Sequence, residues 1–317
     1  MHSSTFNSEE LPVRNRRYQP WVIALVAGIV LFLAGIEAAA RFVFPRTSRI
    51  AGRVQREQAE AGAIGKDGGS EHTVLLVGNS LMLEGLNVES LRAGLPPGWR
   101  LVRFVVEQAD YLDWYYGLRR LFAEGARPQV VAIMLSPAQT IADSIRGEFF
   151  ARHLMQLSDL GRLTHELKLH PTRETGLAFG NLSEFYGSRA EVRNWLLLRI
   201  LPEFNSVARL LTKRSPISAD TSPYRAAAPR LRAMREEVEI HQARFVFLLP
   251  PGLRTKDADS RLLEAAQAAG VTVVSAVPSD SLPAADFSDG IHLTGPGREI
   301  YTSKLVPLMR EYLNGPR

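Results

Sequence analysis

Residues 73–80 read TVLLVGNS, an unbroken apolar run that ends in a glycine, an asparagine and a serine. A short continuous apolar run bounded by turn residues predicts a strand that is buried on both faces of a parallel sheet. Gly78 permits a tight turn after this strand, so that Asn79 and Ser80 stand where the next helix begins. The stretch therefore predicts a strand–turn–helix unit with Ser80 at the carboxyl end of the strand, the edge where parallel sheets bind ligands.

Further strands and helices follow the same pattern along the chain. Four more apolar runs are predicted strands, at residues 101–106, 129–135, 244–249 and 271–275. Helical periodicity lies between several of them, at residues 110–124, 226–242 and 258–269. A last helix follows Thr294 and is expected to bury Tyr301, Leu305, Leu308 and Tyr312. Strands that alternate with helices predict an α/β fold with a doubly wound, five-stranded parallel sheet.

A long aromatic-rich segment at residues 140–224 interrupts this alternation. A structureless loop of this length is uncommon in a compact domain. We therefore expect a mostly helical insertion between the third and fourth strands. The α/β domain, including this insertion, is predicted to occupy residues 72–317.

The N-terminus carries a hydrophobic segment outside this domain. Residues 21–36 read WVIALVAGIVLFLAGI, and the apolar character extends to residue 43. This length predicts one transmembrane helix at 21–43, between an N-terminal tail at 1–20 and a polar linker at 44–71. A signal peptide cleaved after the alanines at 38–40 and a buried core helix are the alternatives.

Composition narrows the possible partners. The formal net charge is +5, yet no Lys/Arg-rich block with interleaved aromatics exists, so we expect no nucleic-acid partner. A thinly spread basic charge is better suited to anionic lipid or an anionic polymer. Cysteine is absent, which excludes disulfides, zinc–thiolate sites and cysteine nucleophiles. His153, His165 and His170 lack an acidic pattern around them, so we expect structural or surface roles, no metal site and no cofactor.

A second polar motif, Asp289-Gly290-Ile291-His292, stands just before the last helix. A serine hydroxyl becomes a useful nucleophile when a histidine takes its proton and a carboxylate orients that histidine. Ser80, His292 and Asp289 could form such a set, because a doubly wound sheet can bring both motifs to one edge. Taken singly, Asn79 and Ser80 could only cap a helix, and the second motif could be a surface turn.

The paired G-N-S and D-G-I-H motifs resemble those of the SGNH (GDSL-like) hydrolase and acyltransferase superfamily, whose fold is flavodoxin-like. The resemblance covers about residues 72–314 without the insertion. It implies that Ser80 is the nucleophile, His292 the base and Asp289 its partner. Asn79 stands where many members carry Asp, and Gly78 and Asn79 belong to the same substrate-facing turn.

Two positions depart from the family pattern. The family places an oxyanion-binding Gly after the second strand, where this chain has Gln108, and an Asn after the third strand, where it has Gln139. The resemblance implies that these two glutamines face the oxyanion or the substrate. Their presence argues against ordinary esterase activity.

The stretch Ser136-Pro137-Ala138-Gln139 is similar to a membrane-anchored subgroup that includes lipoteichoic acid D-alanylation and alginate O-acetylation proteins. That resemblance implies a multi-span membrane O-acyltransferase as acyl donor, an envelope polysaccharide as acceptor, and contact with membrane lipid. The leading hypothesis is an anchored acyltransferase or esterase that O-acetylates a cell-envelope or exported polysaccharide. A catalytically silent assembly protein of the same fold and a secreted lipase-like hydrolase are the alternatives.

The arginines that flank the hydrophobic segment and the family resemblance predict opposite orientations of the domain. Three arginines precede the hydrophobic segment, and five follow it between residues 41 and 56, which taken alone favours a cytoplasmic domain. The chemistry implied by the resemblance is extracytoplasmic. We therefore expect a single-pass membrane protein with a periplasmic or extracytoplasmic domain.

Overall fold

The computed structural model describes residues 19–66, 71–201 and 225–315. Its centre is a five-stranded sheet in the order β2-β1-β3-β4-β5, and every neighbouring pair is parallel. The strands are β1 (His72–Gly78), β2 (Trp99–Val105), β3 (Val130–Met134), β4 (Arg244–Leu249) and β5 (Thr272–Ser275). The predicted α/β fold is confirmed, and each strand starts and ends within two residues of its predicted run.

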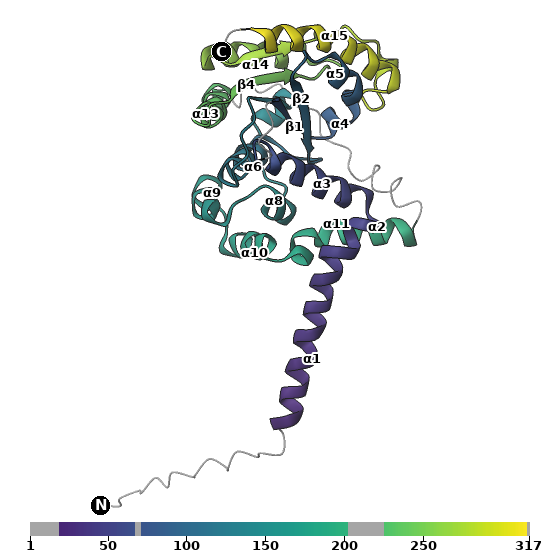
Figure 1. Cartoon of the computed structure of the whole chain (residues 1–317), viewed down its shortest axis with the longest axis vertical. Coiled ribbons are helices and arrows are strands. Elements are labelled where there is room, and N and C mark those ends of the chain that lie inside the picture. The colour runs from purple at the N-terminus through teal and green to yellow at the C-terminus, as the bar shows by residue number, and fades with distance from the viewer. Residues whose placement is uncertain (1–18, 67–70, 202–224, 316–317) are drawn as a thin grey trace, which may run out of the picture.

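Helices cover both faces of the sheet because side chains alternate along each strand. Val74 and Leu76 of β1 enter one apolar core, and Leu75 and Val77 enter the other. The first core is closed by α4 (Ser80–Gly85), α5 (Val88–Gly94) and α15 (Gly295–Asn314). The second is closed by α3 (Arg49–Ala63), α6 (Tyr111–Ala123), α13 (Ala227–Glu239) and α14 (Lys256–Ala269). The sheet is therefore doubly wound, and Figure 1 shows these layers.

The hydrophobic N-terminal segment is a separate helix that extends away from the α/β domain (Figure 1). Helix α1 (Gln19–Ala38) continues through a π-helical turn at Ala39–Val43 into α2 (Phe44–Thr47). No side chain of α1 is buried in the protein. The stretch Gln19–Thr47 is long and apolar enough to cross a membrane, a property that a signal sequence shares.

The segment predicted to be a linker is instead largely helical. Helix α3 occupies Arg49–Ala63, and its Val54 and Ala61 are fully buried in the core. Its Glu57 carboxylate accepts hydrogen bonds from the Arg103 side chain at 2.9 Å and from the Val105 backbone N–H at 2.8 Å. Helix α3 thus covers the edge strand β2. The linker prediction is wrong for residues 49–63. Their polar composition is typical of a linker, but the polar side chain of Glu57 binds the edge strand instead of solvent.

Helices also fill the described part of the predicted insertion, which is shown in teal and green in Figure 1. They are α7 (Pro137–Thr140), α8 (Glu148–His153), a 3₁₀ turn at Leu157–Asp159, α9 (Leu160–Leu167), α10 (Pro171–Leu182) and α11 (Glu184–Ile200). Helices α8, α10 and α11 pack against one another, and Phe149 and Phe150 of α8 are buried in the core. The remainder of the predicted insertion, residues 202–224, lies outside the described residues.

Candidate active site

Ser80 stands at the first position of α4, directly after β1. Gly78 is needed here because of close packing: a Cβ atom would lie 2.9 Å from the Met134 carbonyl oxygen and 3.1 Å from Met82 Cε. The absence of a Cβ atom lets the end of β1 pack closely against β3 and the first turn of α4. Within the described part of the chain, the Ser80 backbone N–H has no hydrogen-bond acceptor, as is usual in the first turn of a helix.

Asn79 fixes this turn from inside the protein. Its side chain is fully buried, and its Oδ1 accepts a hydrogen bond from the Leu81 N–H at 3.0 Å. Its Nδ2 donates to the Ala109 carbonyl oxygen at 2.8 Å, in the loop that follows β2. Asn79 therefore caps α4, the simpler of the two expectations, and also ties together two loops at the carboxyl edge of the sheet.

The second motif lies on a narrow loop before α15. Phe287 and Leu293 form an antiparallel bridge, and the Ser288 N–H donates to the His292 carbonyl oxygen at 2.8 Å. Gly290, at the tip, has φ = +89°, a conformation that favours glycine. The Leu253 N–H, just after β4, donates to the Gly290 carbonyl oxygen at 3.1 Å and holds the tip at the sheet edge.

These two loops bring Ser80, His292 and Asp289 into one hydrogen-bonded chain. His292 Nε2 lies 2.9 Å from Ser80 Oγ, and His292 Nδ1 lies 2.7 Å from Asp289 Oδ2. This is the geometry in which a serine hydroxyl donates to a neutral imidazole whose other nitrogen donates to a carboxylate. Chemically, the arrangement can remove a proton from Ser80 as its oxygen attacks an acyl carbon.

Asp289 is held in its ionised form. Partial burial alone would raise the pKa of its carboxyl group, but hydrogen bonds from the His292 backbone and ring and from the Ile291 backbone outweigh it. The net effect lowers the pKa of Asp289 below its ordinary value. The backbone bonds, at 2.9 Å from His292 and 3.1 Å from Ile291, both reach Oδ1 and leave Oδ2 for the imidazole.

Gln108 and Gln139 are not joined to the triad by any hydrogen bond of the described residues. Gln108 is exposed in the loop after β2 and has φ = +62°, a left-handed conformation that glycine adopts without steric cost. Gln139 Oε1 accepts from the Ser136 N–H at 2.9 Å, so that its side chain is folded back onto the start of α7. Both lie after strands whose carboxyl ends border Gly78, and their roles toward an oxyanion or substrate remain predictions.

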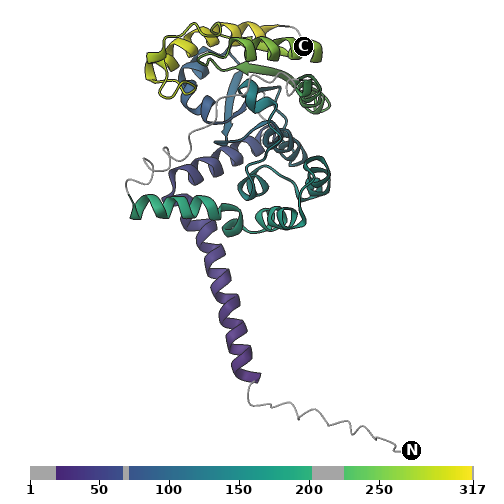
Figure 2. The same ribbon diagram turned by 180° about the vertical axis from the view of Figure 1, so that it is seen from behind.

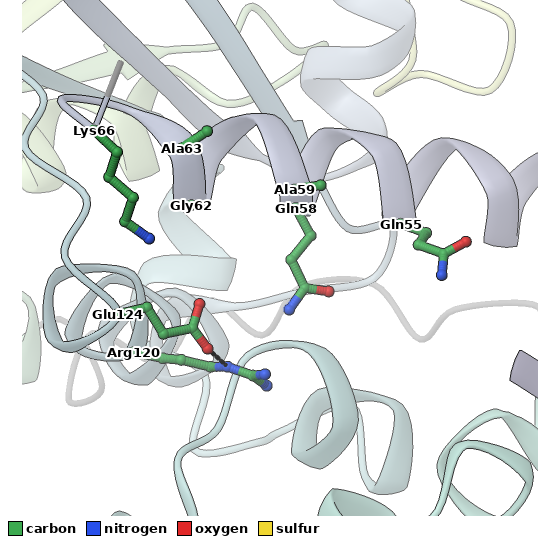
Figure 3. A pocket seen from close by; sticks show the side chains of 8 residues that line it. All are labelled: Gln55, Gln58, Ala59, Gly62, Ala63, Lys66, Arg120 and Glu124. Carbon is green, nitrogen blue, oxygen red and sulfur yellow. Dashed lines mark hydrogen bonds and ion pairs between the residues drawn. The ribbon is translucent and has the colours of Figure 1, made fainter. Parts of the chain in front are cut away.

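Two other histidines and a surface cavity lie apart from the triad. His153 contacts Gln58 through Nδ1 at 2.9 Å, and His170 caps the start of α10. A cavity of about 430 Å³ lies between α3 and the end of α6, lined by Lys66, Arg120, Glu124 and other residues shown in Figure 3. Since these helix ends precede β1 and β3, the cavity lies toward the amino edge of the sheet.

Sequence reasoning missed the residues that hold the site together. The bond from Asn79 to Ala109 and the bond from Leu253 to Gly290 both cross between loops that are far apart in sequence. The one available signal was position: Asn79, Ala109 and Leu253 each come shortly after a strand, and Gly290 belongs to the motif before the last helix. Which atoms meet across such an edge depends on strand order, which periodicity does not specify.

Comparison with known proteins gives weak similarity only. No family model matches the chain, and a search of curated proteins found no match. Among solved structures, TesA is 14% identical with a TM-score of 0.38, over 76% of this chain and 99% of that chain. A putative acylhydrolase from Bacteroides fragilis is 12% identical with a TM-score of 0.44, over 82% and 95%. Axe2, an acetylxylan esterase from Geobacillus stearothermophilus, is 14% identical with a TM-score of 0.37, over 75% and 94%.

Proposed function

We propose that this chain is a serine acyltransferase or esterase, anchored in a membrane by α1, that works through an acyl-Ser80 intermediate. The observation that carries the proposal is the continuous hydrogen-bonded chain from Ser80 Oγ through both His292 ring nitrogens to Asp289. If Ser80 only capped a helix and His292 only lay on a surface turn, the three side chains would not need to be aligned in this way. Three side chains that meet in the order nucleophile, base and carboxylate are a recognised acyl-transfer arrangement.

The reaction follows from the positions of these groups. Ser80 Oγ attacks the acyl carbon while its proton passes to His292 Nε2, and Asp289 stabilises the imidazolium that forms. The unpaired Ser80 N–H is a donor for the oxyanion of the tetrahedral intermediate. His292 then gives the proton to the leaving group, and the acyl group stays on Ser80. An acceptor hydroxyl, deprotonated by the same nitrogen, removes the acyl group and regenerates the serine.

The proposed acceptor is a sugar hydroxyl of a cell-envelope or exported polysaccharide, and the proposed acyl group is acetyl. A multi-span membrane O-acyltransferase would supply the acyl group, and the domain would lie outside the cytoplasm. These points rest on the resemblance of the G-N-S, S-P-A-Q and D-G-I-H motifs. The competing proposal is a silent assembly protein, and its specific support is that glutamines replace the family's Gly and Asn oxyanion donors at 108 and 139.

The test is an acetyl-transfer assay with the purified full chain in detergent or nanodiscs. Acetyl release from an aryl acetate is measured with and without a de-acetylated envelope polysaccharide, for the wild type and for Ser80→Ala. The proposal expects slow release that polysaccharide accelerates, acetate found on the polymer, and neither in Ser80→Ala. Equal rates with and without polymer would leave a plain esterase, and no release in either protein would favour the silent assembly role.

A further inference from the structure

The end of α1 is fixed to the helical insertion by one glutamate. Glu37 accepts hydrogen bonds from Ser183 Oγ at 2.8 Å, from the Glu184 N–H at 2.8 Å and from the Phe185 N–H at 3.1 Å. These N–H groups open helix α11 and have no partner within that helix. The charged residue that interrupts the apolar segment therefore acts as a cap that holds α11 at the depth where the apolar run ends.

Apolar side chains are exposed around this junction. Phe179 and Leu182 at the end of α10 are 54% and 63% exposed, and Phe185 at the start of α11 is also exposed. Further along α11, Leu196 and Ile200 are exposed one helical turn apart. Figures 1 and 2 both show α10 and α11 as the folded elements nearest the free part of α1. We call the exposed apolar residues at the end of α10 and along one side of α11 the platform: Phe179, Leu182, Phe185, Leu196 and Ile200.

On the same two helices, the basic side chains are exposed and the acidic side chains are partly buried. All four arginines between residues 171 and 200 are exposed, and none of the three glutamates in that range is. Two of these glutamates form ion pairs with the rest of the domain, Glu184 with Arg152 and Glu191 with Arg146. Along α11, Arg189 and Arg193 share the exposed stripe with Leu196 and Ile200 at helical spacing.

We propose that the platform lies on the lipid surface of the membrane that α1 enters, with its apolar side chains among the acyl chains and its arginines at anionic headgroups. Exposed apolar side chains interspersed with arginines can contact both the apolar layer and the anionic headgroups of a bilayer surface. Long arginine side chains reach the headgroups while their neighbours enter the apolar layer. The Glu37 cap makes the platform continuous with the apolar surface of α1, so a bilayer around α1 also meets α10 and α11. The proposal rests on α1 residing in a bilayer.

This arrangement directs the candidate active site toward the membrane. Arg53, one turn into α3, donates to the Val105 carbonyl oxygen at the carboxyl end of β2. Ile64, just past the other end of α3, accepts from the Arg127 N–H ahead of β3. Helix α3 therefore runs antiparallel to the strands, and its start, which joins α2 and α1, lies at the edge that carries Ser80. The β1 arrowhead in both views points toward α1 (Figures 1 and 2). A donor or acceptor held at the membrane surface would then lie on the side of the domain that carries the site.

Labelling single cysteines tests the proposal, because the full chain contains none of its own. Leu182→Cys and Ile200→Cys place a fluorophore on the platform, and Ile240→Cys, which is 70% exposed beside the sheet, is the matched control. Each protein is reconstituted through α1 into vesicles of phosphatidylcholine and phosphatidylglycerol that contain a nitroxide-labelled lipid. Quenching at 182 and 200 should exceed that at 240 by at least about twofold, with blue-shifted emission. Equal quenching and equal access to aqueous iodide at all three sites would overturn the proposal.

A charge-reversal variant tests whether the platform contacts lipid or another protein. Arg193→Glu in the Ile200→Cys background should reduce quenching in vesicles that contain phosphatidylglycerol and change it little in pure phosphatidylcholine. Protection of the platform only after a second membrane protein is added would contradict a lipid surface. None of these readouts requires activity, and Ser80→Ala should give the same quenching. Failure of the platform and failure of the acyl-transfer proposal are therefore distinguishable.

Discussion

His292 Nε2 lies 2.9 Å from Ser80 Oγ although 212 positions separate the two residues in sequence. The contact exists because the β1–α4 turn and the loop before α15 meet at the carboxyl edge of one parallel sheet. Neither loop is held by the triad alone. Asn79 ties the first to Ala109, and the Leu253 N–H ties the second at Gly290.

The role of Asp289 can be separated from the fold of its loop. Asp289→Asn keeps an oxygen for the Ile291 and His292 N–H groups but places an amide where Nδ1–H needs an acceptor. We expect kcat/KM for an activated ester to fall by up to about 10⁴-fold, with little change in Tm. Asp257→Asn, an exposed change on α14, is the control and should keep full activity. An active Asp289→Asn protein would show that His292 needs no carboxylate.

The close packing at Gly78, two residues before Ser80, should not accept a methyl group. Gly78→Ala places a Cβ 2.9 Å from the Met134 carbonyl oxygen, a backbone atom that cannot move without disturbing β3. The free energy of unfolding should fall by about 1–3 kcal/mol in a denaturant titration, and activity should fall with it. Gly85→Ala, at the far end of α4, meets only an ordinary contact with Leu293 at 3.8 Å and should fold normally. Equal stability of the two variants would contradict the close approach.

The left-handed conformation of Gln108 gives a test of the loop after β2. Gln108→Gly removes the steric cost of φ = +62° and should stabilise the protein by roughly 1 kcal/mol. Gln242→Gly, at φ = +64° beside the start of β4, should stabilise it equally and serves as the control. If the loop borders the oxyanion, only Gln108→Gly should also change aryl-ester turnover, upward by at least about threefold. Identical turnover in both variants would remove Gln108 from the site.

Acid should destabilise the protein through His153. Burial, together with the nearby Arg152, Arg120 and Arg146, lowers the pKa of His153 from 6.5 to about 3. Between those values the unfolded chain binds a proton that the folded protein does not, so stability falls as pH decreases. One such group contributes a slope of up to about 1.4 kcal/mol per pH unit.

The variant His153→Gln tests this by denaturant titration between pH 7 and 4. The variant should lose less stability on acidification than the wild type does. The exposed His165→Gln is the control and should keep the steep acid limb. If the acid limb of His153→Gln matches that of the wild type, another group is responsible for the acid sensitivity.

Much of the sheet could be predicted because its strands are continuous apolar runs buried on both faces. The helix at residues 49–63 could not, since its sheet-facing positions include Glu57, whose burial is made possible by Arg103 and a β2 backbone donor. The last helix was located correctly, but Met309 and Leu313 are the fully packed residues, whereas Leu308 and Tyr312 are half-buried. Both pairs have helical spacing, and only tertiary packing distinguishes them.

The residues of the candidate site could be predicted from the sequence, but the hydrogen bonds that hold their loops in place could not. Ser80, Asp289 and His292 belong to recognisable motifs at predicted turns. They lie close together because a doubly wound sheet places both turns at the same edge. The Gln139 side chain folds onto Ser136, a local capping arrangement that competes with any role toward substrate. Glu37 is a charged residue at the end of the apolar segment, and its bonds to residues 183–185 could not be predicted because they depend on a helix 146 or more positions away.

The central claim is that Ser80 is a nucleophile activated by His292, and a covalent-adduct measurement tests it most directly. The full chain in detergent is treated with a fluorophosphonate, and its intact mass and tryptic peptides are recorded. We predict one adduct per chain on the peptide that contains Ser80, its absence in Ser80→Ala, and at least about 10³-fold slower labelling in His292→Ala. Labelling that persists in Ser80→Ala, or a wild-type chain that takes up no adduct, would contradict the account.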